Sequence, residues 1–260
     1  MDGQVNLFGV MVSLAGAKEA LQKTNELFAD SKRHIIRFVD TKACMTAKND
    51  EDCKALIERG DLVLPANLST EEGVKQYVKG YREVFWHKDY FEGLFTKAVD
   101  EAMEIYFYTA TDKEYDQISD FLLDSFPYLA IHGKSMESLY ESDTGEINSR
   151  YGMLANDINS VAPEILFLYV DINEQNSFLE RCYDVVNARV MICGTGMFYY
   201  ISGEQVSELS GDEVMPEKLG KRLVYMFERI KQAIKGMAFK SAVLLNKSKD
   251  TDSKNDEKSD

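Results

Sequence analysis

The feature that most constrains this chain is a regular alternation of short apolar segments with amphipathic segments of about 10 to 18 residues. Residues 164–170 form the clearest apolar segment, since six consecutive apolar side chains follow Glu164. Such a run is typical of a strand buried on both faces of a parallel sheet. Strands that alternate with helices of this length form βαβ units, so we predict an α/β fold with a mostly parallel, Rossmann-like sheet flanked by helices.

The predicted elements follow from periodicity and from capping residues. Strands are predicted over residues 5–10, 34–39, 62–64, 104–108, 129–132, 164–170 and 189–193. Helices are predicted over residues 13–30, 41–59, 90–102, 112–125, 146–160 and 173–187. A further short helix is expected after residue 68, with Ser69 or Thr70 as its N-cap.

Parallel strands bring their carboxyl ends to one edge of the sheet, and ligands of such folds bind beyond that edge. The predicted strands end at or beside the following residues: Asp40, Pro65, Thr109, Gly133, Asp171 and Gly194. We therefore expect the functional site among the loops that begin at these positions.

The composition is that of a soluble globular protein, with 45% hydrophobic and 28% charged residues. No apolar run approaches the ~18 residues of a membrane span, and the first residues lack the pattern of a signal peptide. The four cysteines show no zinc-like spacing, so we expect reduced, mostly buried thiols in a cytoplasmic protein. The net charge of -14 argues against a nucleic-acid partner.

The charge is distributed unevenly along the chain. Residues 217–247 carry eight Lys and Arg against two Glu, together with apolar residues at helical spacing. We predict an α/β domain over 1–216, a basic amphipathic helical appendage over 217–247 and a disordered charged tail over 248–260. The appendage has two interpretations, a peripheral contact with the inner face of the cell membrane or packing against the acidic body.

Several short segments resemble one bacterial enzyme family in their order and spacing. They include Asn6-Leu7-Phe8-Gly9-Val10, Ala47-Lys48-Asn49-Asp50 and Ala162-Pro163-Glu164-Ile165-Leu166-Phe167. Over residues 5–231 the chain is similar to the WecG/TagA/CpsF glycosyltransferases. The resemblance implies transfer of an N-acetylmannosamine-like N-acetylhexosamine from a UDP donor to a lipid-linked or glycan acceptor, in cell-surface polysaccharide synthesis. It also implies no cofactor and no metal. The Asp50-Glu51-Asp52 segment is accordingly interpreted as the solvated face of a helix.

The residues that would carry the family's chemistry are mostly changed. Where the family has Pro-Asp-Gly, with the Asp as proposed base, this chain has Pro65, Ala66 and Asn67. Asp89 matches a family Asp, and Asp40 replaces a family Asn. An alanine cannot accept a proton, so the family mechanism cannot operate unchanged here.

Three side chains are the candidates to replace the missing base: Asp40, Asp89 and His87. The alternative for Asp40 is that it caps the helix that follows it.

The resemblance also implies four residues for substrate binding: Gln175, Gly194, Gly196 and Arg222. The glycines would bring backbone N–H groups to a phosphate, and Arg222 would lie near the nucleotide diphosphate. The alternatives are a tight turn for the glycines and an exposed amide at a helix start for Gln175.

We therefore predict a divergent glycosyltransferase. The alternative is a catalytically inactive family member that binds nucleotide-sugar or a partner glycosyltransferase as a regulator or scaffold. A third alternative is an unrelated small-molecule enzyme on the same scaffold. Members of the family are thought to change oligomeric state, so a homo-oligomer is also an expected form.

Overall fold

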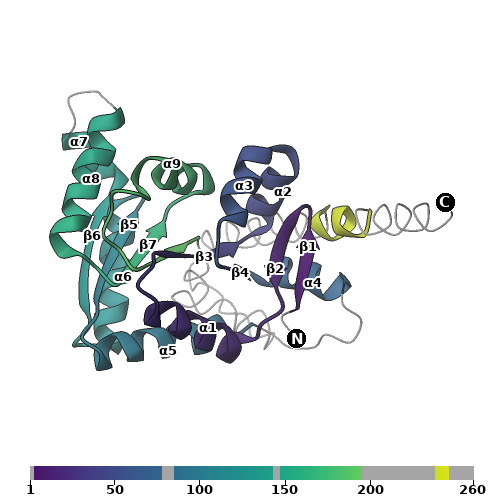
Figure 1. The fold of residues 1–260 in the computed structure, drawn as a ribbon, viewed down its shortest axis with the longest axis horizontal. Helices are drawn as coiled ribbons and strands as arrows, with labels where there is room; N and C mark the ends of the chain where they lie inside the picture. Colours follow the sequence, from purple (N-terminus) through teal and green to yellow (C-terminus); the bar gives the residue numbers. More distant parts are fainter. Residues whose placement is uncertain (1–2, 78–84, 143–146, 195–237, 246–260) are drawn as a thin grey trace, which may run out of the picture.

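A computed structural model describes residues 3–77, 85–142, 147–194 and 238–245 (Figure 1). Its centre is a six-stranded sheet in the order β4-β3-β8-β7-β5-β6, and every neighbouring pair is parallel. The predicted Rossmann-like α/β fold is confirmed. The sheet consists of β3 (His34–Val39), β4 (Leu62–Pro65), β5 (Glu104–Thr109), β6 (Ala130–Ser135), β7 (Ile165–Tyr169) and β8 (Val190–Cys193).

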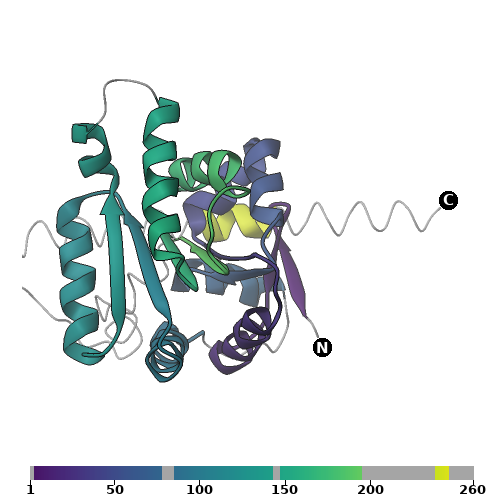
Figure 2. The same ribbon diagram turned by 60° about the vertical axis from the view of Figure 1, so that its left-hand side comes forward.

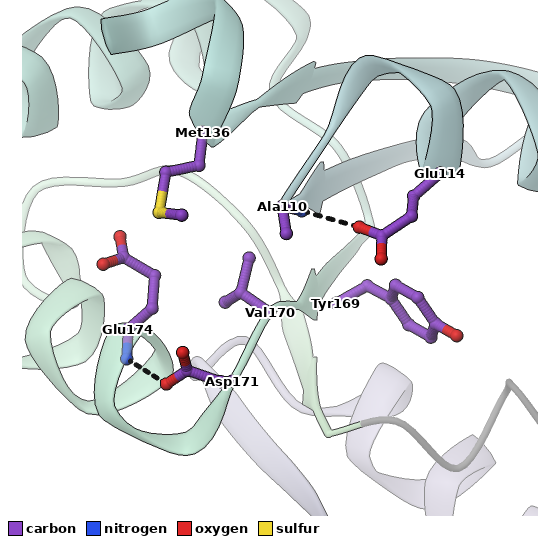
Figure 3. A pocket seen from close by; sticks show the side chains of 7 residues that line it. All are labelled: Ala110, Glu114, Met136, Tyr169, Val170, Asp171 and Glu174. Carbon is purple, nitrogen blue, oxygen red and sulfur yellow. Dashed lines mark hydrogen bonds between the residues drawn. The ribbon is translucent and has the colours of Figure 1, made fainter. Parts of the chain in front are cut away.

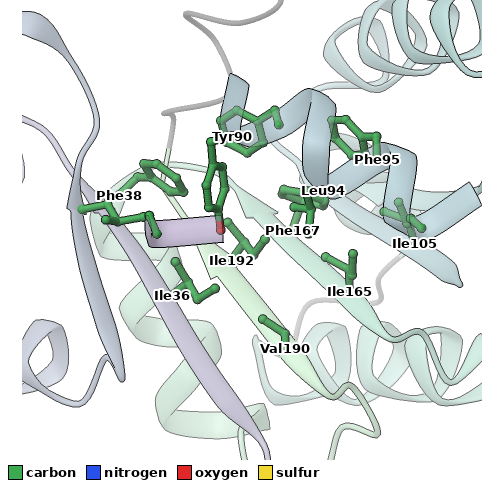
Figure 4. Close-up of a cluster of buried hydrophobic side chains, with 14 of the residues drawn as sticks. Ile36, Phe38, Tyr90, Leu94, Phe95, Ile105, Ile165, Phe167, Val190 and Ile192 are labelled. Carbon is green, nitrogen blue, oxygen red and sulfur yellow. The ribbon is translucent and has the colours of Figure 1, made fainter. Parts of the chain in front are cut away.

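Helices cover both faces of the sheet (Figure 2). The described helices are α1 (Ala17–Ala29), α2 (Thr41–Asn49), α3 (Glu51–Glu58), α4 (Leu68–Tyr77), α5 (His87–Asp100), α6 (Asp112–Ser125), α7 (Met136–Ser142), α8 (Ile147–Val161) and α9 (Ile172–Cys182). On one face, α1, α5 and α6 pack on alternate strand residues such as Phe38 and Phe167 (Figure 4). The rings of Phe107 and Phe167 stack there with their centroids 4.6 Å apart.

The opposite face is covered by α8 and α9 over one half of the sheet and by α2 and α3 over the other. Arg37 of β3 is buried between these two groups of helices. Its guanidinium donates to Asn176 Oδ1 of α9 at 3.2 Å and to the Leu56 carbonyl of α3 at 3.0 Å. One buried side chain therefore ties the strand to both helices.

The strand order creates a switch point between β5 and β7. The chain leaves β5 through α6 toward β6 on one side, and it leaves β7 through α9 toward β8 on the other. Accordingly, α6 packs on one face of the sheet and α9 on the opposite face. The loops after these two adjacent strands diverge, which opens a crevice at the carboxyl edge.

The N-terminal prediction of one strand over residues 5–10 is wrong. The structure has an antiparallel hairpin of β1 (Gln4–Leu7) and β2 (Val10–Ser13). The turn residues Phe8 and Gly9 both have positive φ, 57° and 95°, as a two-residue hairpin turn requires. Asn6 Oδ1 accepts the Gly9 N–H at 2.7 Å and stabilises the turn. The hairpin packs beside β4 and α4 at one end of the sheet.

The single helix predicted over 41–59 is also wrong, because Asp50 divides it into α2 and α3. Asp50 has extended backbone angles, and its side chain accepts the Cys53 N–H at 3.0 Å as the N-cap of α3. The acidic segment after Asn49 is therefore a helix start, where carboxylates offset unpaired N–H groups. Two smaller differences concern α5, which begins three residues before the predicted Tyr90, and α7, which was not predicted.

The four cysteines are free and buried, as expected. Residues 238–245 of the basic segment are helical and pack against the body (Figure 1). The Phe239 ring lies edge-on to Phe8 at 5.6 Å, and Lys240 pairs with Glu72 of α4. The predicted boundary at 216/217 and the tail 248–260 lie outside the described residues, and membrane contact by the rest of segment 217–247 stays a prediction. Within the described parts of the chain, no helix is long and apolar enough to span a bilayer.

Gly194, directly after β8, offers a test of this packing. Its φ is +116°, and a Cβ there would lie 2.2 Å from the Phe38 carbonyl oxygen of β3. We expect Gly194→Ala to lower the free energy of unfolding by more than ~2 kcal/mol in denaturant titrations. Gly152→Ala on α8, where a Cβ meets nothing within 4 Å, is the control and should stabilise by up to ~1 kcal/mol. Equal stability of the two variants would contradict the close approach of β8 to β3.

Candidate functional site

The carboxyl edge of the sheet holds two groups of predicted or newly found site residues. One surrounds the end of β4, where the family's base would stand. The other lines a pocket at the β5/β7 switch point. Because β3 and β8 lie between them, the two groups are separated by three to four strand spacings, roughly 14–19 Å.

Ala66, at the position predicted for the family's base, is 1% exposed, and its N–H donates to the Val39 carbonyl at 2.9 Å. The next side chain, Asn67, is used to start α4. Its Oδ1 accepts both the N–H and the hydroxyl of Thr70, each at 2.9 Å. Asn67 therefore caps this helix, and the expectation that Ser69 or Thr70 does so is wrong.

Asp40 caps α2, as the structural alternative predicted. Its Oδ1 accepts the Ala43 N–H at 2.7 Å, and its backbone is extended, as is typical of an N-cap. The side chain is half-buried at the carboxyl end of β3. A catalytic role for Asp40 stays a prediction, and it would have to coexist with the capping bond.

His87 joins the start of α5 to the end of β4. It is 1% exposed, and its Nε2 donates to the Pro65 carbonyl at 3.0 Å. The imidazole packs against the Phe85 ring at 4.9 Å and the Phe38 ring at 6.0 Å. Asp89 is exposed in the same first turn of α5. The bond to Pro65 therefore places the Asp89 turn beside Ala66.

Gln175 is buried, which excludes the alternative of an exposed amide, and its predicted contact with substrate stays a prediction. It is 4% exposed, and its Nε2 donates to the Val170 carbonyl at 2.7 Å, which fixes the loop between β7 and α9. Gly194 begins the loop after β8, and its N–H lies 3.3 Å from the Leu168 carbonyl. Its positive φ confirms a turn that only glycine adopts without strain. Gly196 and Arg222 lie outside the described residues.

The pocket at the switch point has a volume of about 420 Å³ (Figure 3). Residues from the ends of β5 and β7 and from the starts of α6, α7 and α9 line it: Ala110, Glu114, Met136, Tyr169, Val170, Asp171 and Glu174. A cleft of this size with apolar walls and a few polar groups is the usual form of a small-molecule site. The strand ends that flank the pocket are predictable from the sequence, whereas Glu114 and Glu174 are not among the predicted site residues.

Glu174 is a pocket carboxylate that two tyrosine hydroxyls hold in place. Its Oε1 accepts hydrogen bonds from the Tyr108 hydroxyl at 2.7 Å and the Tyr151 hydroxyl at 3.0 Å. Burial and the Glu174 charge raise the pKa of both tyrosines, so they keep their protons and donate. Figure 3 shows Glu174 and Met136 on one side of the pocket and Glu114 on another.

The other two carboxylates of the pocket are helix caps. Asp171 accepts the Asn173 and Glu174 N–H groups at the start of α9. Glu114 accepts the Ala110 N–H at 3.1 Å and completes a capping box with Thr111 at the start of α6. The described lining thus has three carboxylates and includes no Lys or Arg.

The fold defines an α/β protein with a candidate small-molecule site beyond the carboxyl ends of its parallel strands. The sequence model described as "Glycosyl transferase WecG/TagA/CpsF family" matches residues 5–207. The chain therefore belongs to the WecG/TagA/CpsF family of glycosyltransferases, transferases of cell-surface polysaccharide biosynthesis that act on a sugar donor and an acceptor. No curated protein matches the chain.

The capping role of Asp40 can be separated from any catalytic role. Asparagine is as good an N-cap as aspartate, whereas alanine loses the bond to the Ala43 N–H. We expect Asp40→Ala to cost ~1 kcal/mol of unfolding free energy and Asp40→Asn to cost only a few tenths, measured by denaturant titration. Equal losses in the two variants would show that the hydrogen bond to α2 is not what Asp40 contributes.

Proposed function

We propose that the protein is a divergent glycosyltransferase that transfers an N-acetylhexosamine-type, N-acetylmannosamine-like sugar. The donor is a UDP-sugar, and the acceptor is a lipid-linked or other glycan. The observation that supports this most is the 420 Å³ pocket at the switch point, in a chain whose family transfers sugars. The pocket is large enough for a ligand and lies at the edge where this fold binds its substrates, although the predicted base position carries an alanine.

The chemistry of the pocket fits the ribose of the UDP donor, so the transferred sugar would extend past Gly194 toward the end of β4. Carboxylates accept hydrogen bonds from sugar hydroxyls, and Met136 and Val170 provide apolar contact. A diphosphate would be repelled, since one pair of like charges ~6 Å apart costs about 3 kcal/mol at an effective dielectric constant of ~20. We place the diphosphate instead at the Gly194 loop, with Gly196 and Arg222 as its predicted partners.

Asp89 is the predicted catalytic residue with the best access to substrate. Asp40 and His87 hold α2 and the start of α5, whereas the Asp89 side chain is exposed in the turn beside Ala66. We assign to Asp89 a hydrogen bond from the acceptor hydroxyl, which orients that oxygen toward the sugar carbon. Such a contact contributes to turnover even when another group takes the proton.

A second candidate function is binding without transfer. It is favoured by one observation: Ala66 is buried and cannot accept a proton. In that case the protein would bind a nucleotide-sugar, or a partner glycosyltransferase, and regulate or scaffold synthesis.

Calorimetric titration with UDP and with UDP-N-acetylhexosamines tests the binding proposal. We expect dissociation constants on the order of micromolar, and we expect Arg222→Ala to weaken both ligands because it removes the cation near the diphosphate. Glu174→Gln should weaken UDP and the UDP-sugars to a similar extent, because both ligands carry the ribose. Glu180→Gln, an exposed glutamate on the same helix, is the control and should change neither. Unchanged binding of both ligands by the Glu174→Gln variant would contradict a ribose-binding pocket.

Turnover of a bound donor tests the catalytic part. We expect Asp89→Asn to lower the rate of UDP release with glycan or lipid-linked acceptors by ~100-fold, because a positioned carboxylate is lost. Asp100→Asn, on the exposed far end of α5, is the matched control and should leave the rate unchanged. Tight UDP-sugar binding without any turnover in the unmodified protein would instead support the regulatory candidate.

A further inference from the structure

Glu71 on α4 is a buried carboxylate, and only one of its two oxygens has polar partners among the described residues. It is 2% exposed. Its Oε1 forms an ion pair with Lys75 Nζ at 3.0 Å and accepts a hydrogen bond from the Phe85 N–H at 3.2 Å. Its Oε2 is buried and has no hydrogen-bond partner among the described residues. Buried polar atoms are nearly always paired, so an unpaired carboxylate oxygen calls for an explanation beyond packing.

The position of Glu71 links it to both segments that flank the missing base. Its N–H donates to the Asn67 carbonyl at 3.1 Å, so it lies one helical turn beyond Ala66. Its Oε1 holds the N–H of Phe85, two residues before the His87 that bonds to Pro65. Side chains in the first turn of a helix lean back toward its N-terminus, which here is the end that carries Ala66.

We propose that Glu71 supplies the proton-accepting carboxylate that Ala66 lacks. The inference rests on the proposed transferase activity. In this step the acceptor O–H bond breaks and its proton passes to the buried Glu71 Oε2 through one bridging water. The acceptor oxygen forms a bond to the anomeric carbon, and the bond from that carbon to the UDP oxygen breaks, with its electron pair leaving on UDP. The unpaired oxygen is then the reactive atom.

The electrostatic surroundings suit this role. Burial raises the pKa of Glu71 above its ordinary value, the Lys75 ammonium and the Phe85 N–H lower it, and Glu72 raises it. Glu72 is itself paired with Lys240. A general base works best when its pKa lies near the working pH, and a raised glutamate pKa moves in that direction. Asp89 then orients the acceptor hydroxyl while Glu71 takes its proton.

The test compares Glu71→Gln with Glu58→Gln, an exposed glutamate at the end of α3 and at the opposite edge of the sheet. With the best-bound UDP-N-acetylhexosamine and its acceptor, Glu71→Gln should lower kcat at least ~100-fold, while KM and the melting temperature stay close to those of the unmodified protein. Glu71→Asp, which keeps a carboxylate, should recover part of the rate. Glu58→Gln should behave like the unmodified protein.

The pH profile separates catalysis from a structural role. A base is active when deprotonated, so the rate falls as the pH drops through its pKa. In the Glu71→Gln variant, the residual rate should no longer show this fall at low pH, the acid limb of the pH profile. Lys75→Met removes a group that lowers the Glu71 pKa, so the limb should move to higher pH. This second variant keeps the test decisive if Glu71→Gln fails to fold.

Each result has one meaning. An unmodified protein that releases no UDP would overturn the proposed function. An active unmodified protein whose Glu71→Gln variant keeps its rate, or whose acid limb is unmoved in Lys75→Met, would overturn the assignment of Glu71 alone.

Discussion

Both faces of the parallel sheet must be shielded from water, and much of the architecture follows from that requirement. Strands β3, β7 and β8 send apolar side chains to both sides, so helices have to cover each face. Polar chemistry is consequently restricted to the strand ends. The crevice opens between β5 and β7 because covering helices there depart to opposite faces.

At these strand ends, several polar side chains cap the helices that follow, whether or not they also take part in catalysis. Asp40, Asp171 and the Thr111–Glu114 pair each satisfy N–H groups at a helix start. Asn67 does the same for α4. These caps fix the loop geometry around Ala66 independently of its own side chain.

The fold was largely predictable from the sequence, for identifiable reasons. The apolar run before Asp171 could only be a buried strand, and Asp40 carried a clear capping signal. The hairpin was missed because Phe8 adopts positive φ, which its residue type does not favour. The break at Asp50 was missed because the acidic residues 50–52 fit the solvated face of one continuous helix as well as a helix start.

The site was less predictable, since it depends on the order of strands in space. Nothing local indicates that β7 lies beside β5, so the pocket around Glu174 could not be assembled from the sequence. Gln175 was expected at the surface because its burial depends on how α9 packs. Glu71 gave no signal, because its hydrogen-bond partner Phe85 is distant along the chain.

The contact of Phe239 and Val243 with the N-terminal hairpin brings together nearly the first and nearly the last described residues. During synthesis the hairpin emerges early, but the side chains that cover Phe8 emerge more than two hundred residues later. Until then an apolar part of its surface has no partner from its own chain. At the ~5–20 residues per second of translation, this interval lasts on the order of ten seconds or more. The helix over residues 238–245 thus completes the packing around Phe8, and the nascent protein is more prone to aggregate before this helix emerges.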